Sequence, residues 1–215
     1  PFAKSLKWLQ LNNAGTEGYC DGALPEGVVL TNATGAYGLA ISEHMVGMLF
    51  ELQKKLNLYN RNQRDHIWRS EGHVKVIQES RVLVIGMGDI GTAFAQKMKG
   101  LGCRTVGIRK REARKPEGVD DLFTLERLEQ QLPKADIVAL SLPGNQDTYH
   151  LLNEERIAML KPGAVVMNVG RGITIDTEAL TRALQEKRIA GAALDVTDPE
   201  PLPADHPLWD MENVI

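Results

Sequence analysis

The chain has 215 residues, 43% of them hydrophobic, which suits one large or two small globular domains with a real core. Its formal net charge is −3, and no long basic block appears, so nucleic acid is not expected as the main partner. No apolar stretch is long enough to predict a membrane span, and no charged segment followed by an apolar one predicts a signal peptide.

The two cysteines, Cys20 and Cys103, have no metal-ligand spacing and are too few for a disulfide framework. A reducing compartment is the usual setting of such a chain. We therefore expect a cytoplasmic protein that has neither a membrane partner nor a bound metal.

The first third of the chain predicts short strands and then a long helix. Strand-like apolar runs lie within residues 6–20 and 27–35, and a helical pattern extends from about Ala40 to Asn60. The apolar positions of this helix, near helical spacing, are Ile41, Met45, Met48, Leu49, Leu52 and Leu56. A polar stretch that contains Trp68 continues to about residue 80.

Beyond residue 80, apolar runs of strand length alternate with amphipathic helices. The runs are residues 82–85, 105–108, 136–140, 164–168 and 190–196. Such near-continuous apolar runs are typical of parallel strands that are covered on both faces. Two of the helices have clear capping residues, Asn153 before "EERIAML" and Asp176 before "TEALTRALQEKR". The alternation predicts an α/β protein with a doubly wound parallel sheet.

Three glycines follow the first of these runs in the segment "VLVIGMGDIG", residues 82–91. At this spacing Gly86 would make a tight turn, and Gly88 would let the backbone approach a pyrophosphate. Gly91 would let the next helix pack closely on its strand, so that its N-terminal amides point at the phosphates. A glycine triplet alone is a weak signal for a bound nucleotide.

The segments after the other runs strengthen this signal. Ligands of doubly wound sheets bind outside the carboxyl ends of the strands, and here those ends carry cations, glycines and an acid. The segments concerned are Arg109–Arg111, Ser141–Gly144, Val169–Gly172 and Asp195. Because periodicity and chemistry agree at one edge of the sheet, the sequence predicts a nucleotide site there.

In these segments the chain resembles the D-isomer-specific 2-hydroxyacid dehydrogenases. The resemblance is carried by "VLVIGMGDIG", "LLNEERIAMLKPGAVVMNVGRG", "IDTEALTRALQEKRIAGAALDV" and "DPEPLPADHPLW". Pairing "NVGRG" with "LDVTDPEP" is specific to this family, and "NNAGTEGY" and "AISEHMVGML" fit its substrate-side loop and the helix that links its two domains.

The resemblance implies a particular division of the chain. Residues 39–215 would form a Rossmann nucleotide-binding domain, in which 39–75 supply the linking helix and a dimerisation arm. Residues 1–38 would be the remnant of a second, flavodoxin-like substrate domain. We therefore expect a homodimer, which is the commonest protein assembly.

The resemblance also implies hydride transfer between NAD(P)H and a small 2-oxo acid or D-2-hydroxy acid, such as glyoxylate or hydroxypyruvate. Arg171 would hold the substrate carboxylate and polarise its carbonyl, which suits a planar, permanently charged guanidinium. Glu200 would bond to the catalytic histidine and raise the pKa of that imidazole. The amides of the loop Ala14, Gly15 and Thr16 would receive the substrate carboxylate.

On the cofactor side, the residues implied to line the site are Gly86, Gly88, Asp89, Ile90, Gly91, Leu142, Pro143, Thr148, Val169 and Gly170. Asp195 would bond to the nicotinamide carboxamide. A typical NAD-binding turn has an acid after its second strand, whereas this chain has Arg109, Lys110 and Arg111. Since an arginine can receive a 2′-phosphate, we expect NADP, with NAD as the alternative. A solvated basic loop is the competing interpretation of this cluster.

The family's catalytic histidine would follow "NVI", residues 213–215, by a few positions, and the sequence given stops there. The histidines that are present match non-catalytic family positions: His44, His66, His73, His150 and His206. We therefore expect a chain that is shortened at both ends.

Two other functions stay open. The same fold occurs in corepressor-like binding proteins that sense nicotinamide nucleotides, and a cofactor-binding remnant without activity is a third interpretation. Turnover of a 2-oxo acid distinguishes the enzyme from both.

Overall fold

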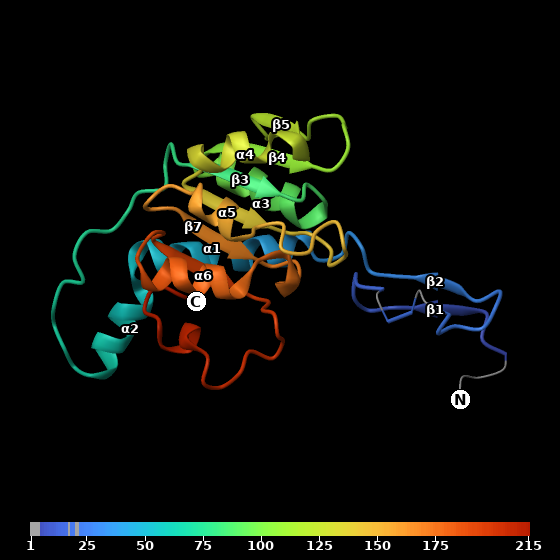
Figure 1. Cartoon of the computed structure of the whole chain (residues 1–215), viewed down its shortest axis with the longest axis horizontal. Coiled ribbons are helices and arrows are strands. Elements are labelled where there is room, and N and C mark those ends of the chain that lie inside the picture. The colour runs from blue at the N-terminus through green and yellow to red at the C-terminus, as the bar shows by residue number, and fades with distance from the viewer. Residues whose placement is uncertain (1–4, 17, 20–21) are drawn as a thin grey trace.

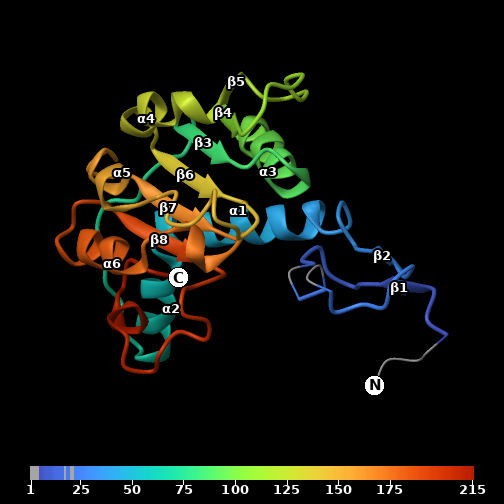
Figure 2. The same ribbon diagram turned by 45° about the vertical axis from the view of Figure 1, so that its right-hand side comes forward.

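The computed structural model describes residues 5–16, 18–19 and 22–215, so Cys20 lies outside the described residues. Near the N-terminus, β1 (Trp8–Gln10) and β2 (Val29–Thr31) pair in parallel as a separate two-stranded sheet. This unit lies beside the main body and joins it through the start of α1 (Gly38–Lys54) (Figures 1 and 2).

The main body is built on one six-stranded sheet. Its strands are β3 (Arg81–Ile85), β4 (Arg104–Arg109), β5 (Asp121–Thr124), β6 (Ile137–Leu140), β7 (Val165–Asn168) and β8 (Gly191–Leu194). They are all parallel and lie in the order β5-β4-β3-β6-β7-β8, which confirms the doubly wound prediction. The strand order reverses between β3 and β6, and ligands of such sheets bind at this switch point.

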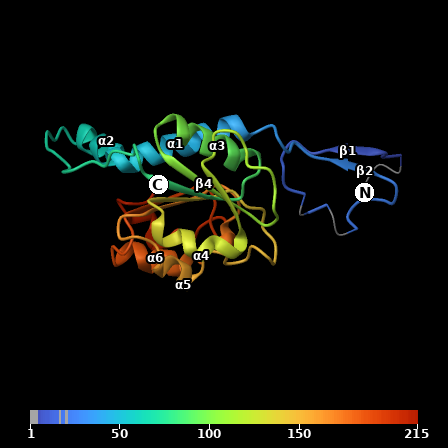
Figure 3. The same cartoon turned by 90° about the horizontal axis from the view of Figure 1, so that it is seen from above.

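Helices cover both faces of the sheet (Figure 3). On one face α1 packs against α3 (Asp89–Gly100), and on the other lie α4 (Leu128–Gln131), α5 (Glu154–Ala158) and α6 (Thr177–Gln185). Short 3₁₀ turns occupy Leu125–Arg127, Leu132–Lys134, Gly172–Thr174 and Pro207–Asp210. These two layers leave the carboxyl ends of the strands at one edge.

The strands alternate between two hydrophobic cores. Val82 and Val84 of β3 belong to the cluster that contains Phe94 of α3, whereas Leu83 and Ile85 belong to the cluster under α4, α5 and α6. Successive side chains of a strand point to opposite faces, and both faces of β3 are buried. Burial on two faces explains why the strand is a continuous apolar run in the sequence.

Both predicted helix caps are confirmed. The Oδ1 atom of Asn153 accepts a hydrogen bond from the Arg156 N–H at 3.0 Å, and Oδ1 of Asp176 accepts one from the Ala179 N–H at 2.9 Å. Each bond satisfies a backbone donor that the first turn of the helix leaves unpaired.

The helix predicted over residues 40–60 is two helices. Lys55 adopts a left-handed conformation, φ 57°, which ends α1 and starts α2 (Leu56–Arg64) in a new direction. The predicted apolar face holds for Met45, which is fully buried, but not for Leu56, which is 46% exposed. The break takes Leu56 off the buried stripe, a change that side-chain periodicity alone does not reveal.

One predicted strand is shorter than expected, and one observed strand was not predicted. Within the described residues of the strand-like run 6–20, only the three residues of β1 are a strand, and the edge strand β5 was not predicted. The sequence of β5, "DLFT", is short and only half-buried, so it lacks the apolar run that marks the inner strands.

Among the described residues, no helix combines the length and the apolar character needed to cross a membrane.

Asp136 stabilises the edge of the sheet where the amino ends of the strands lie, opposite the carboxyl ends that form the predicted site. Its Oδ2 atom accepts from the Arg81 N–H at 2.8 Å, and its Oδ1 atom accepts from Lys161 Nζ at 3.0 Å. Partial burial raises the pKa of the Asp136 carboxyl, but these hydrogen bonds outweigh that effect and hold the pKa below its usual value.

We predict that Asp136→Asn lowers the free energy of unfolding by about 1–2 kcal/mol at neutral pH, because the amide replaces the anionic acceptor. A carboxyl whose folded pKa is depressed stabilises the fold above its unfolded pKa and stops doing so as pH falls through the folded pKa. The difference in the free energy of unfolding between wild type and variant, measured by urea denaturation, should therefore decrease below about pH 4. Asp205→Asn, on an exposed loop, is the control. A gap that does not vary with pH would contradict the assignment.

Candidate functional site

The glycine turn after β3 is shaped by close backbone contacts. Gly86 has φ +102°, and a Cβ there would lie 2.6 Å from the Ser141 carbonyl oxygen. A Cβ on Gly91 would lie 2.0 Å from the Gly86 carbonyl oxygen, which also accepts a hydrogen bond from Ser141 Oγ at 2.7 Å. A Cβ on Gly88 would meet no atom within 4 Å. Two glycines thus hold the turn against β6 and α3, and Gly88 leaves its open side free.

One pocket, of about 330 Å³, lies between the glycine turn and the end of β4; we call it the β4 pocket. Its lining residues are Ile85, Gly86, Met87, Gly88, Ile108, Arg109, Lys110, Leu125, Leu142, Asp147, Thr148 and Leu151. Apolar walls beneath two cations suit a flat heteroaromatic group that carries phosphate.

A second pocket, of about 520 Å³, lies between the N-terminal unit and the strand ends; we call it the N-terminal cleft. It is lined by Asn13, Ala14, Gly15, Ala33, Thr34, Gly35, Tyr37, Ile41, Gly88, Asp89, Ile90, Ser141, Leu142, Pro143, Val169, Gly170 and Arg171. Gly88 and Leu142 line both pockets, so the two form a continuous path across the switch point.

Most of the predicted site residues meet along this path. The predicted loop residues Ala14 and Gly15 line the cleft together with Arg171, whereas Thr16 is not among the lining residues. Thr148 lines the β4 pocket, away from the cleft.

Arg171 is held at the cleft by a turn built on Asn168. The buried Asn168 amide donates to the Arg171 carbonyl oxygen at 3.0 Å, and its Oδ1 accepts from the Gly170 N–H at 3.1 Å. A Cβ on Gly170 would lie 2.4 Å from the Leu142 carbonyl oxygen, so this turn packs directly on the segment after β6. Arg171 Nη1 donates back to the Gly170 carbonyl oxygen at 2.8 Å.

The loop that carries Glu200 passes beside Arg171. A Cβ on Gly172 would lie 1.9 Å from the Thr197 carbonyl oxygen, so only glycine admits this crossing. Glu200 itself is exposed and lines neither pocket. Its predicted partner, a histidine after residue 215, lies beyond the sequence given.

Two predicted residues, Asp195 and Arg111, line other pockets, and a third, Asp89, lines the N-terminal cleft but also lies beside α1. Asp195 lines a hollow beside α1, where its Oδ1 lies 3.6 Å from His44 Nε2. Arg111 faces a separate pocket that also contains Arg127, rather than the β4 pocket. The Asp89 carboxylate lies at the start of α1, since a Cβ on Gly38 would be 2.5 Å from its Oδ2.

None of the chain's five histidines, all of which the structure describes, lines either pocket. Within the described residues, no group of three or more His, Cys, Asp or Glu side chains is arranged to hold a metal ion.

Three residues that shape the site were given no individual role from the sequence, although each lies within a segment that the sequence analysis named: Asn13, Ser141 and Asn168. Asn168 had a usable signal, because a buried strand rarely ends in an amide unless its hydrogen bonds are needed. Ser141 donates to the Gly86 carbonyl oxygen and the Asn13 carbonyl oxygen accepts from the Ala33 N–H, and no local pattern shows these contacts between separate segments.

A parallel sheet of this order, with a glycine turn and a cation at its switch point, defines a dinucleotide-binding domain of the Rossmann type. Residues 46–215 match the family model of the D-isomer specific 2-hydroxyacid dehydrogenase, NAD binding domain. The chain belongs to this family, and the resemblance seen in the sequence is confirmed.

Relatives support the same assignment. A glyoxylate reductase of Korarchaeum cryptofilum is 33% identical over 201 residues, which are 90% of this chain and 59% of the relative. A D-isomer specific 2-hydroxyacid dehydrogenase family protein of Aeromonas salmonicida has a TM-score of 0.89 at 35% identity, over 98% of this chain and 67% of the other.

A D-isomer specific 2-hydroxyacid dehydrogenase of Xanthobacter autotrophicus, solved with NADPH and MES, has a TM-score of 0.85 at 33% identity, over 99% of this chain and 67% of the other. The chain thus spans about three fifths to two thirds of the length of these relatives. Their names are those of dehydrogenases and reductases, and they give no support to the nucleotide-sensing alternative.

The residues present fit a nicotinamide dinucleotide. Gly88 leaves its backbone open beside the N-terminus of α3, where amides and the helix dipole favour phosphate. The β4 pocket has apolar walls for an adenine ring, and the N-terminal cleft reaches from the same glycine to Arg171.

Proposed function

We propose that this chain supplies the cofactor-binding part of an enzyme that transfers a hydride between NAD(P)H and a small 2-oxo acid. The supporting observation is the N-terminal cleft, because Gly15, Arg171 and Gly88 of the glycine turn all line it. When bound, the nicotinamide would supply the hydride.

In this proposal Arg171 binds the substrate carboxylate and polarises the carbonyl next to it. A guanidinium presents several donors in a fixed plane, which suits a carboxylate beside a carbonyl. The amides of the Ala14–Gly15 loop complete the carboxylate site from the other wall of the cleft. Glu200 positions a histidine that protonates the forming alkoxide.

We also propose NADP as the preferred cofactor. Arg109 and Lys110 line the β4 pocket, at the place where NAD-binding domains carry an acid. The Xanthobacter relative was solved with NADPH, which agrees with this preference. Asp195 keeps its proposed role at the nicotinamide carboxamide.

We further infer that residues 1–38 belong to the substrate domain, because β1 and β2 form a sheet separate from that of the main body.

A cytoplasmic location is inferred from Cys103, whose thiol is free and donates to the Ile77 carbonyl oxygen at 3.1 Å. Burial raises the pKa of this thiol, so it is a structural rather than a reactive cysteine.

The first test is turnover. The whole protein should consume NADPH with glyoxylate or hydroxypyruvate, followed by loss of reduced-cofactor absorbance. Arg171→Met should lower kcat/KM about 10²–10³-fold, because the forming charge loses its cation. Arg171→Lys should restore part of this loss. The control is Arg182→Met, which removes an exposed arginine paired with Glu154 on the surface. No turnover of any 2-oxo acid by the wild type would overturn the proposed function.

The second test concerns the cofactor. Arg109→Asp should weaken NADPH binding about 10–100-fold, since a charge-assisted hydrogen bond to the 2′-phosphate is replaced by repulsion. NADH binding should change far less. The matched control is Arg111→Asp, because Arg111 faces a different pocket. Equal weakening of both cofactors by Arg109→Asp, measured by calorimetric titration, would refute the NADP preference.

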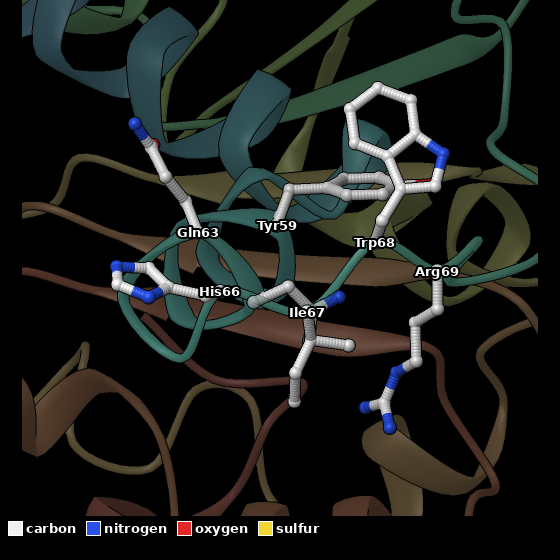
Figure 4. A pocket seen from close by; sticks show the side chains of 7 residues that line it. Tyr59, Gln63, His66, Ile67, Trp68 and Arg69 are labelled. Atoms are coloured by element: carbon white, nitrogen blue, oxygen red, sulfur yellow. The ribbon is translucent and has the colours of Figure 1, made fainter.

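We propose that the segment from α2 to residue 76 forms a homodimer interface. Trp68 is fully exposed, Val76 is 68% exposed, and a hollow of about 450 Å³ lies beside Trp68 (Figure 4). Glu71 fixes this segment, since its Oε1 accepts from Arg69 Nε at 2.8 Å and from the Asn62 amide. An exposed apolar surface on a segment that projects from the main body is typical of a protein–protein interface. In a two-fold dimer this surface of each protomer would be covered by its partner.

Trp68→Ser should weaken the dimer at least ~30-fold, because exposed tryptophans are frequent interaction hot spots. Sedimentation velocity over a range of protein concentrations measures this shift. Trp209→Ser, at another exposed tryptophan that lies on the turn Pro207–Asp210, is the control. A wild-type protein that stays monomeric throughout would contradict the proposal.

A further inference from the structure

A salt bridge spans the β4 pocket. Lys110 Nζ, from the segment after β4, lies 2.6 Å from Asp147 Oδ2, from the segment after β6. Both residues line the pocket, and their side chains are 66% and 67% exposed, so the pair lies at the mouth rather than in the wall. We call this pair the clasp.

Asp147 is the fixed half of the clasp. Its N–H donates to Asn145 Oδ1 at 3.0 Å, and the neighbouring Thr148 Oγ1 donates to the Pro143 carbonyl oxygen at 2.7 Å. The Asn145 N–H donates to Thr148 Oγ1 at 3.0 Å, which closes the turn. This network holds the backbone of Asp147 in place, whereas Lys110 reaches it through a flexible chain of methylenes.

The clasp changes the charge that a ligand meets. Arg109 and Lys110 provide two cations in the β4 pocket, and Asp147 cancels one of them. The hydrogen bond from Lys110 lowers the pKa of the Asp147 carboxyl, so the acid is ionised at neutral pH. An exposed ion pair of this kind adds little to stability, so a dianionic ligand can compete for the lysine.

We propose that Asp147 is a specificity-determining residue that restrains binding of a 2′-phosphate by holding Lys110 away from it. This inference rests on the proposed NADP preference and refines it. Arg109 then acts as the standing 2′-phosphate ligand, and Lys110 is shared between the phosphate and Asp147. A dinucleotide that lacks the 2′-phosphate brings no charge to this position and is indifferent to the clasp.

The test is the dissociation constant of NADPH and of NADH, measured by titration calorimetry with the full chain. Asp147→Asn should tighten NADPH about 3–10-fold, because one negative charge leaves the pocket, and should change NADH less than about 2-fold. The NADPH gain should shrink at high salt, since the groups are exposed. The matched control is Asp121→Asn, which breaks the ion pair with Arg104 at the opposite end of β4.

A second variant distinguishes an effect of Asp147 through Lys110 from direct repulsion between the Asp147 carboxylate and the 2′-phosphate. In a Lys110→Met background no lysine is released, so Asp147→Asn should give a clearly smaller NADPH gain than it gives in wild type. Equal gains in both backgrounds would overturn the proposal, as would equal tightening of NADPH and NADH or a gain matched by Asp121→Asn.

The failure of this proposal is distinguishable from failure of the proposed function. If the wild type binds NADPH in preference to NADH but Asp147→Asn does not tighten NADPH, only the clasp is refuted. If the wild type binds neither dinucleotide, both the proposed function and the proposed role of Asp147 are refuted.

Discussion

The contact between the glycine turn and the end of β6 is the constraint on which both pockets depend. Gly86, Gly91 and Ser141 approach so closely that a Cβ on either glycine would overlap a backbone oxygen. This contact closes the turn after β3, brings the N-terminus of α3 to the switch point and lets Leu142 line both pockets. A larger residue at Gly91 would push α3 away from β3 and open the site.

The same device recurs at the next strand. Gly170 packs on the Leu142 backbone and Gly172 packs on the Thr197–Asp198 backbone, so two close contacts bring the segments after β6, β7 and β8 together. The Asn168 side chain accepts from the buried Gly170 N–H and shares the Arg171 carbonyl oxygen with Thr174, so the backbone groups of this tight turn are hydrogen-bonded. Arg171 is therefore presented by a rigid support, which is what a group that orients a substrate requires.

Charge is distributed unevenly along the path between the pockets. At the β4 end Arg109, Lys110 and Asp147 lie together, whereas the charged residues that line the cleft are Asp89 and Arg171. The Asp89 carboxylate lies at the start of α1, beside the N-terminal cleft that this residue helps to line. There the positive end of a 17-residue helix favours the acid. The helix that links the two parts of the chain thus also touches the glycine turn.

The sequence by itself determined the type of sheet, because strands buried on both faces must be continuous apolar runs, and it determined the helix caps and the glycine turn. It also indicated Arg109 and Arg171 by their place at strand ends. Tertiary structure alone decided the break at Lys55, the neighbours of Asp195 and Arg111, and the pairing of Lys110 with Asp147. The physical reason is range: caps and turns depend on residues a few positions apart, whereas these contacts depend on how separate strands and helices approach in space.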